Sequence, residues 1–166
     1  VHLWVAALDG SGATDLMAGW DVTAGDCTLG EVPGRGDVGP VWTADGAALR
    51  VVVSDQGRVD LWRLATDGAR VCEARDAAGF TAAGETVVHL GVTPTDAGDL
   101  YAGERRLTRV NGALLEEIAL QEPQVLRVAA PDGQAVPCLA LLPPDFAQDP
   151  RPRPTLLYLH GGPHLM

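Results

Sequence analysis

Short apolar runs separated by turns rich in glycine and proline fill the N-terminal part of the chain, and this pattern predicts β-strands rather than long helices. The Asp45-Gly46 pair separates two of the runs, and Asp-Gly is favoured in hairpin turns that need positive φ. We therefore expect four consecutive antiparallel strands, at residues 41–43, 48–54, 59–64 and 69–73.

A second group of four runs follows the first. The stretches around Trp4, Trp62 and Tyr101 resemble one another, because each is an apolar run that leads into a turn. Repeats of about 40 to 50 residues with four strands each are typical of β-propeller blades. The strands of this second blade are expected at residues 80–83, 86–92, 100–102 and 107–110.

The residues before Val41 are interpreted as the tail of an earlier blade, followed by an exposed loop at 20–39 that is rich in glycine and acidic residues. Trp20, His2 and His89 are expected to be packing or surface residues rather than ligands. Residues 1–118 are therefore predicted to be a partial β-propeller of about two and a half blades.

The pattern changes after a connector at 114–120. Two strands joined by Pro131-Asp132-Gly133 form a hairpin, and a segment with five prolines at 143–154 must be an exposed, stiff crossing. Residues 155–159 form a continuous apolar run, which is typical of a buried central strand in a mostly parallel sheet.

Composition places the chain among globular proteins, with 46% hydrophobic and 20% charged residues. Twelve basic against twenty-two acidic residues leave a net charge of −10, which disfavours nucleic acid and anionic membrane surfaces as partners. Three scattered cysteines predict neither a disulfide framework nor a metal site. No apolar run approaches the roughly 18 residues of a membrane span, and no signal peptide is evident, so a cytoplasmic location is expected.

The most informative string is His160-Gly161-Gly162-Pro163-His164, directly after the apolar run. Two adjacent glycines allow a sharp turn and leave the backbone amides uncovered, so that an anionic oxygen can approach an N–H group. In α/β-hydrolases the loop after this strand supplies one donor of the oxyanion hole. A plain strand-ending turn is the alternative interpretation.

Together the Asp-Gly hairpin, the proline-rich crossing and the HGGPH loop resemble the acylaminoacyl-peptidase branch of the prolyl oligopeptidase family, and the blades support this resemblance. Lipase-like relatives carry His-Gly-Gly-Gly instead. The resemblance implies a mostly β fragment: C-terminal propeller blades, then the first strands of an α/β-hydrolase domain at residues 119–166. It also implies an oxyanion donor from the backbone of Gly162 or Gly161, Gly162 being preferred, and a structural role for His160.

No Gly-x-Ser-x-Gly string occurs, and the only serines are Ser11 and Ser54. His164 precedes the position at which this fold places its catalytic histidine, so it is not our candidate base. The chain therefore contains no nucleophile, acid or base to nominate, and no cofactor or metal is implied. By itself this segment is expected to be inactive.

For the intact parent the resemblance implies a serine exopeptidase or oligopeptidase that hydrolyses short peptides through an acyl-enzyme. Its expected partners are those peptides and the remainder of its own catalytic domain, with homo-oligomer formation left open. Two alternatives remain, a non-catalytic propeller module for protein interaction and an esterase of the same fold.

Overall fold

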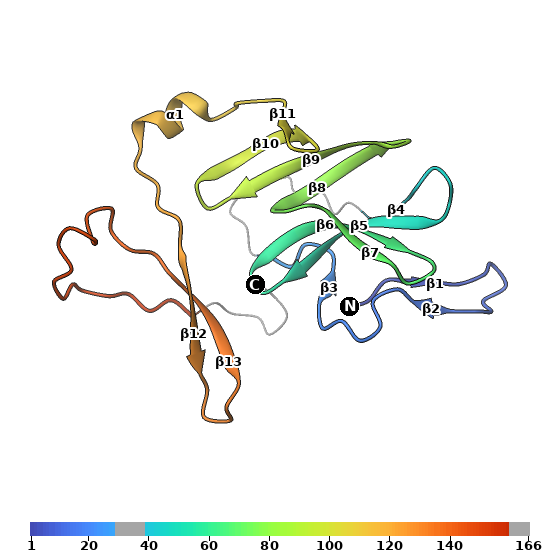
Figure 1. Ribbon diagram of the computed structural model, residues 1–166, viewed down its shortest axis with the longest axis horizontal. Helices are drawn as coiled ribbons and strands as arrows, with labels where there is room; N and C mark the ends of the chain where they lie inside the picture. The colour runs from blue at the N-terminus through green and yellow to red at the C-terminus, as the bar shows by residue number, and fades with distance from the viewer. Residues whose placement is uncertain (29–38, 160–166) are drawn as a thin grey trace.

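The computed structural model describes residues 1–28 and 39–159. These residues form antiparallel β-sheets and one short helix (Figure 1). This confirms the mostly β prediction. The described residues alone form neither a ring of blades nor a parallel sheet, so the propeller and hydrolase assignments remain predictions at this point.

The central sheet is built on three long neighbouring strands, β5 (Ala48–Asp55), β6 (Arg58–Ala65) and β7 (Arg70–Ala74). Their turns contain Gly57 and Gly68, which both have positive φ. β4 (Val41–Trp42) pairs with the first half of β5, as the sequence predicts.

One strand of this sheet was missed. β3 (Thr23–Ala24) pairs with Ser54 and Val53 at the far end of β5, although the sequence predicts an exposed loop there. The Ser54 hydroxyl also accepts a hydrogen bond from the Cys27 amide at 2.9 Å and donates one to the Gly25 carbonyl at 2.7 Å. This buried serine holds residues 25–27 of the acidic, glycine-rich segment against the sheet.

Alternation along β5 gives the central sheet two apolar faces. Leu49, Val51 and Val53 lie on one face and pack with Leu16 and Met17 of the N-terminal segment. The opposite face packs against the second sheet through a cluster of buried side chains, Val52, Val59, Leu61, Ala77 and Phe80. The central sheet is therefore the middle of three layers.

The N-terminal layer contains a small hairpin, β1 (Trp4–Val5) and β2 (Thr14–Asp15). The Trp20 ring lies 4.7 Å from that of Trp62 on β6, edge to face. The Arg70 guanidinium lies over the Trp20 ring and donates hydrogen bonds to the carbonyls of Leu16 and Ala18. The predicted packing role of Trp20 is confirmed.

The second sheet is an antiparallel meander of β8 (Ala77–Ala83), β9 (Thr86–Thr93), β10 (Asp96–Ala102) and β11 (Arg105–Arg106). The first three strands confirm the prediction. The fourth is wrong, because β11 ends before residues 107–110. The buried Asp99 carboxylate on β10 accepts hydrogen bonds from the side chain of Thr108 and the amide of Val110. These groups therefore do not take part in strand pairing.

Helix α1 (Gly112–Glu117) begins two residues before the predicted connector at 114–120 and overlaps its first part. It leads to the hairpin of β12 (Gln124–Ala129) and β13 (Ala135–Ala140). All six residues of β12 pair with β13. Gly133 occupies the turn with φ +85°, as the Asp-Gly signal predicts.

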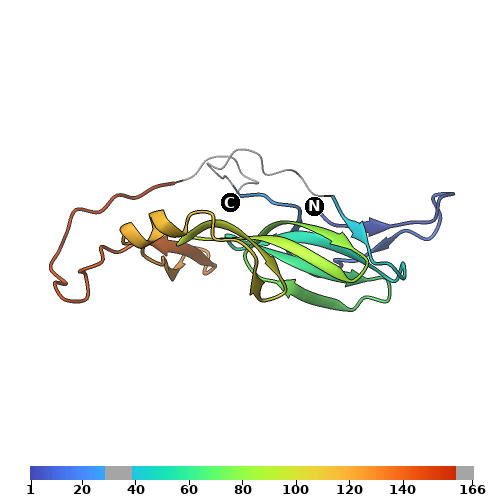
Figure 2. The same cartoon turned by 90° about the horizontal axis from the view of Figure 1, so that it is seen from above.

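After β13 the chain makes a wide loop that leaves the sheets and turns back toward them, without forming a further strand in the described residues (Figure 2). The predicted buried strand at residues 155–159 is wrong in this structure. Its side chains are exposed, with Leu156 at 98% and Tyr158 at 86%. A strand requires a neighbour for its backbone groups, and no described strand pairs with this run.

Candidate functional site

The predicted oxyanion loop falls outside the described residues. This applies to Gly161 and Gly162 and to the flanking His160 and His164. The structure does describe the segment that leads into this loop and the body that precedes it.

Arg153 forms hydrogen bonds with two aspartates in the proline-rich segment before the loop. The Arg153 guanidinium donates two hydrogen bonds to the Asp145 carboxylate, at 2.9 and 3.0 Å, and a third at 3.1 Å to the Asp149 carbonyl. Hydrogen bonding to Arg153 lowers the pKa of Asp145 below its usual range. These hydrogen bonds link residues 145, 149 and 153 to one another, immediately before the run at 155–159.

Neither serine has the surroundings of a catalytic nucleophile. Ser11 lies in the β1–β2 turn, where its hydroxyl donates to Asp9 at 2.6 Å. Ser54 is buried and bonded to backbone groups of the β3 region. No imidazole hydrogen-bonds to either hydroxyl in the described part of the chain, although a serine nucleophile needs such a base.

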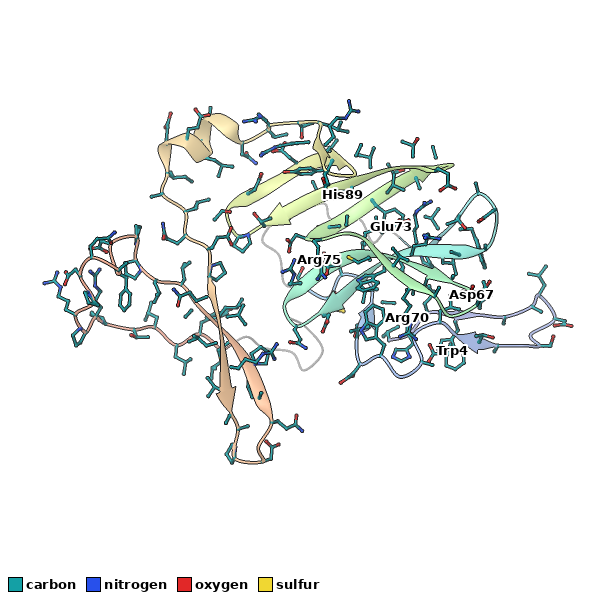
Figure 3. All side chains as sticks on the ribbon, viewed as in Figure 1. Trp4, Asp67, Arg70, Glu73, Arg75 and His89 are labelled. Atoms are coloured by element: carbon teal, nitrogen blue, oxygen red, sulfur yellow. The ribbon has the colours of Figure 1, made fainter. Side chains whose placement is uncertain are left out.

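A groove runs between the outer edge of β7 and the face of the second sheet formed by β9 and β10. One wall is formed by His89, which is labelled in Figure 3, and by Tyr101. The ring centroids of these two residues are 5.5 Å apart, with an angle of 17° between their planes. His89 is only 7% exposed, and its burial lowers the pKa of the imidazole. The ring is therefore neutral near pH 7, with one nitrogen as donor and the other as acceptor.

Gly91 allows Tyr101 to lie flat in this wall. A Cβ atom at this position would come within 2.8 Å of the tyrosine ring. The opposite wall carries Glu73 on β7, whose carboxylate accepts a hydrogen bond from buried Arg50 at 2.8 Å and lies 3.3 Å from the Arg63 guanidinium. Arg50 also reaches Glu85 in the β8–β9 turn, so it connects the two sheets.

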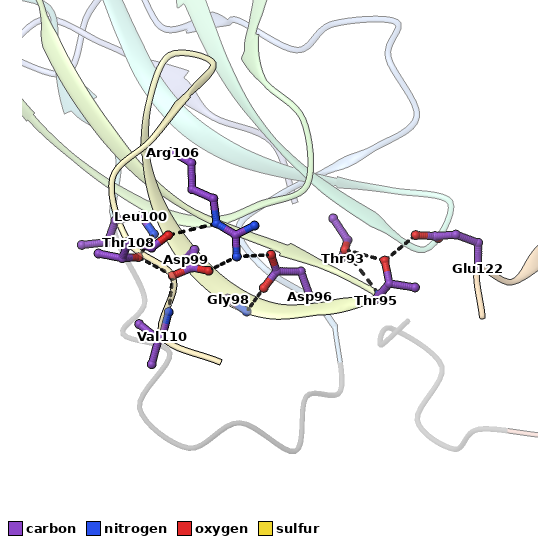
Figure 4. Close-up of polar contacts among 10 residues, drawn as sticks. All are labelled: Thr93, Thr95, Asp96, Gly98, Asp99, Leu100, Arg106, Thr108, Val110 and Glu122. Carbon is purple, nitrogen blue, oxygen red and sulfur yellow. Dashed lines mark hydrogen bonds and ion pairs between the residues drawn. The ribbon is translucent and has the colours of Figure 1, made fainter. Parts of the chain in front are cut away.

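A second polar cluster is centred on Asp99 in the middle of β10 (Figure 4). The buried Asp99 carboxylate accepts hydrogen bonds from the Thr108 hydroxyl, from Arg106, and from the Val110 amide at 2.9 Å. The hydrogen bond from Thr108, followed by those from Val110 and Arg106, lowers the Asp99 pKa to about 2. The cluster fixes the start of the connection to α1.

The described residues contain no group of three or more His, Cys, Asp or Glu side chains that could hold a metal ion. Cys27, Cys72 and Cys138 are free thiols. Burial raises the pKa of Cys72, which disfavours its nucleophilic thiolate form. No helix among these residues is long and apolar enough to cross a membrane.

Comparison with known proteins gives one informative relationship. The chain is 25% identical, over an alignment of 174 positions, to the uncharacterized peptidase YuxL of Bacillus subtilis (strain 168). The alignment covers 98% of this chain and 26% of YuxL, so the chain spans about a quarter of that relative's length. No family model matches the chain. The chain is thus a distant homologue of one part of a peptidase.

Sequence reasoning missed the His89–Tyr101 wall and the Asp99 cluster. The two rings are opposite one another on β9 and β10, a pairing that a correct strand register would have indicated. Asp99 could have been suspected from its place between glycine and leucine in a strand, where an unpaired buried carboxylate would be costly.

Proposed function

We propose that this chain is part of a serine peptidase of the prolyl oligopeptidase type. The observation that carries the proposal is the distant homology to a peptidase along 98% of the chain. Because only a quarter of that relative is covered, the activity of the whole protein is part of the proposal.

The fold supports the proposed domain division. Strands β4 to β7 and strands β8 to β11 are two consecutive antiparallel units that pack on each other through apolar side chains. This arrangement is compatible with adjacent propeller blades within residues 1–118. The isolated β12–β13 hairpin within residues 119–166 would be the start of the α/β-hydrolase domain.

In this proposal the amide of Gly162, or else that of Gly161, donates a hydrogen bond to the oxyanion of the tetrahedral intermediate. The serine, acid and histidine would be supplied by residues outside this chain. One oxyanion donor typically contributes about 3 kcal/mol to transition-state stabilisation. The substrates would be short peptides, the propeller would restrict access, and no cofactor would be needed.

The hairpin suggests where the rest of the catalytic domain would pack. Val125 and Leu139 face one side of the hairpin and Leu126 and Val128 the other, and all four are 46–65% exposed. A two-stranded hairpin with apolar side chains on both sides needs covering layers. In our proposal the remainder of the catalytic domain covers both sides of the hairpin. We further propose that the whole protein is cytoplasmic and can form homo-oligomers.

The proposal is tested by assaying the intact parent protein, of which this chain would be one part, on peptide p-nitroanilides, with and without an N-terminal acyl group, and on p-nitrophenyl esters. We expect hydrolysis of the anilides and inactivation by a fluorophosphonate. Turnover of esters alone would favour an esterase. No turnover and no covalent labelling would favour a non-catalytic interaction module and would contradict the proposal.

A further inference from the structure

The proline-rich segment at residues 143–154 has a stiff second half. Asp149, Arg151 and Arg153 each precede a proline, so that proline alternates with another residue up to position 154. Proline fixes its own φ, and the residue before a proline is restricted to extended backbone. A stretch of this kind behaves as a semi-rigid spacer. The direction of this half therefore determines the direction in which the chain continues at 155–159.

The first half of the segment is a compact turn. The Phe146 amide donates a hydrogen bond to the Pro143 carbonyl at 3.0 Å. The amides of Gln148 and Asp149 both donate to the Asp145 carbonyl, at 3.1 and 3.0 Å. These backbone hydrogen bonds fix Asp145 and Asp149 at the two ends of one turn.

Arg153 connects the stiff half to the turn. Its guanidinium donates to both carboxylate oxygens of Asp145, at 2.9 and 3.0 Å, and to the Asp149 carbonyl at 3.1 Å. A bidentate pair of this kind fixes orientation as well as distance. The Nε atom of Arg153 is shielded from solvent and has no hydrogen-bond partner among the described residues, which costs free energy. The guanidinium is therefore held in the turn by its bonds to the two aspartates.

The apolar run at 155–159 starts from this arginine. The Thr155 hydroxyl donates a hydrogen bond to the Arg153 carbonyl at 3.4 Å. Beyond Thr155 the apolar side chains of the run are at least 79% exposed, and no described strand pairs with it. In the described part of the chain, the contacts of Arg153 and Thr155 are thus the last hydrogen bonds before the loop at 160–164.

We propose that Arg153 is a positioning residue for this loop. By holding the stiff half of the segment on the turn, its guanidinium sets the direction in which residues 155–159 approach the loop, and through them the place of the Gly162 amide. The inference rests on the proposed function, because the oxyanion role of the loop is part of that function. It requires no contact between Arg153 and the substrate.

The test compares Arg153→Met with the unaltered protein, in the intact parent, on a peptide p-nitroanilide. An oxyanion donor acts in the transition state rather than on the bound substrate, so kcat should fall while KM stays the same. The expected decrease is about two- to fivefold, because a partly exposed ion pair can hold the segment only that strongly. Asp145→Ala removes the partner of Arg153 and should lower kcat by a similar factor.

Arg151→Met is the matched control. Arg151 lies in the same proline-rich stretch, but its side chain is 74% exposed and pairs with the Asp149 carboxylate at 2.9 Å rather than with Asp145. Its replacement should leave kcat unchanged. Melting temperatures of all these variants should equal that of the unaltered protein.

A double-mutant cycle separates positioning from general loosening of the domain. Gly162→Pro removes the amide through which Arg153 is proposed to act. Adding Arg153→Met to Gly162→Pro should therefore cause no further decrease in kcat. General loosening would lower kcat by the same factor in both backgrounds.

The outcomes distinguish this inference from the proposed function. If the unaltered protein hydrolyses the anilide, the inference is overturned by an unchanged kcat in Arg153→Met, by an equal decrease in Arg151→Met, or by an undiminished effect in the Gly162→Pro background. If the unaltered protein hydrolyses no anilide, the proposed function itself is contradicted and the inference falls with it. A decrease in Arg153→Met and Asp145→Ala that disappears in the Gly162→Pro background supports both.

Discussion

The two-sheet body (β3 to β11) and the C-terminal segment (residues 119–159) use similar strands but differ in burial. In the body, Leu61 and Leu64 are completely buried and Val53 is 1% exposed. In the C-terminal segment no residue is buried, although its hairpin pairs six residues on each strand. Strand pairing is therefore local, whereas stability depends on a second layer that covers the apolar face.

The largest expected effect separates the two regions directly. Leu61→Ala in the body removes a fully buried side chain and should lower the free energy of unfolding by about 3 kcal/mol. The same change at Leu126 on β12, where the side chain is 46% exposed, should cost less than about 1 kcal/mol. Urea unfolding monitored by circular dichroism measures both. Equal losses would contradict the difference in burial.

Two arginines sharpen the comparison at the level of ion pairs. Arg50→Met leaves partly buried Glu73 with only Arg63 as partner, and it should cost about 2 kcal/mol of unfolding free energy. Arg153→Met removes the ion pairs with Asp145 and Asp149 within the proline-rich segment and should leave the free energy of unfolding nearly unchanged, because exposed ion pairs contribute little to stability. In the Arg153→Met variant, amide hydrogen exchange should become faster only at residues near the proline-rich segment. A global loss from Arg153→Met would show that the crossing belongs to the cooperative core.

The pH dependence of stability gives the next contrast. The Asp99 pKa is about 2 in the folded protein, against an ordinary value near 3.8, so its stabilisation is present above about pH 4 and disappears as the pH falls toward 2. The melting temperature of Asp99→Asn should therefore lie below that of the native protein at pH 7, and the gap should narrow between pH 4 and pH 2.

Asp145→Asn in the crossing is the comparator for this measurement. Its carboxylate is 62% exposed and pairs with Arg153, so the corresponding gap should be smaller at every pH. A gap for Asp99→Asn that stays constant from pH 7 to pH 2 would mean that the loss does not come from the charged form of Asp99.

The sequence predicted most strands of the body because their signals are local. No knowledge of distant contacts was needed to recognise the apolar runs of β5 and β6 or the turn glycines Gly46, Gly68 and Gly133, which all have positive φ. The same holds for the β12–β13 hairpin. The prediction failed at residues 107–110, where the Asp99 side chain on β10 accepts a hydrogen bond from the Val110 amide. It also failed at β3, whose position depends on hydrogen bonds of the distant Ser54 side chain.

The candidate site depends on contacts between residues far apart in the sequence more than the individual strands do. The groove is formed by β7 and by β9 and β10, and the lowered pKa of His89 comes from its burial in the folded sheet. The run at 155–159 shows the converse, because strong β propensity produced no strand without a neighbour. Gly161 and Gly162 remain predictions from sequence, since they lie outside the described residues.

The central claim, that this chain carries the oxyanion loop of a peptidase, is tested most directly by comparing Gly162→Pro with Gly162→Ala in the p-nitroanilide assay. Proline removes the backbone N–H, whereas alanine keeps it. The proposal predicts that proline lowers kcat at least a hundredfold and alanine much less, with melting temperatures alike. An unchanged kcat in the proline variant would contradict the account.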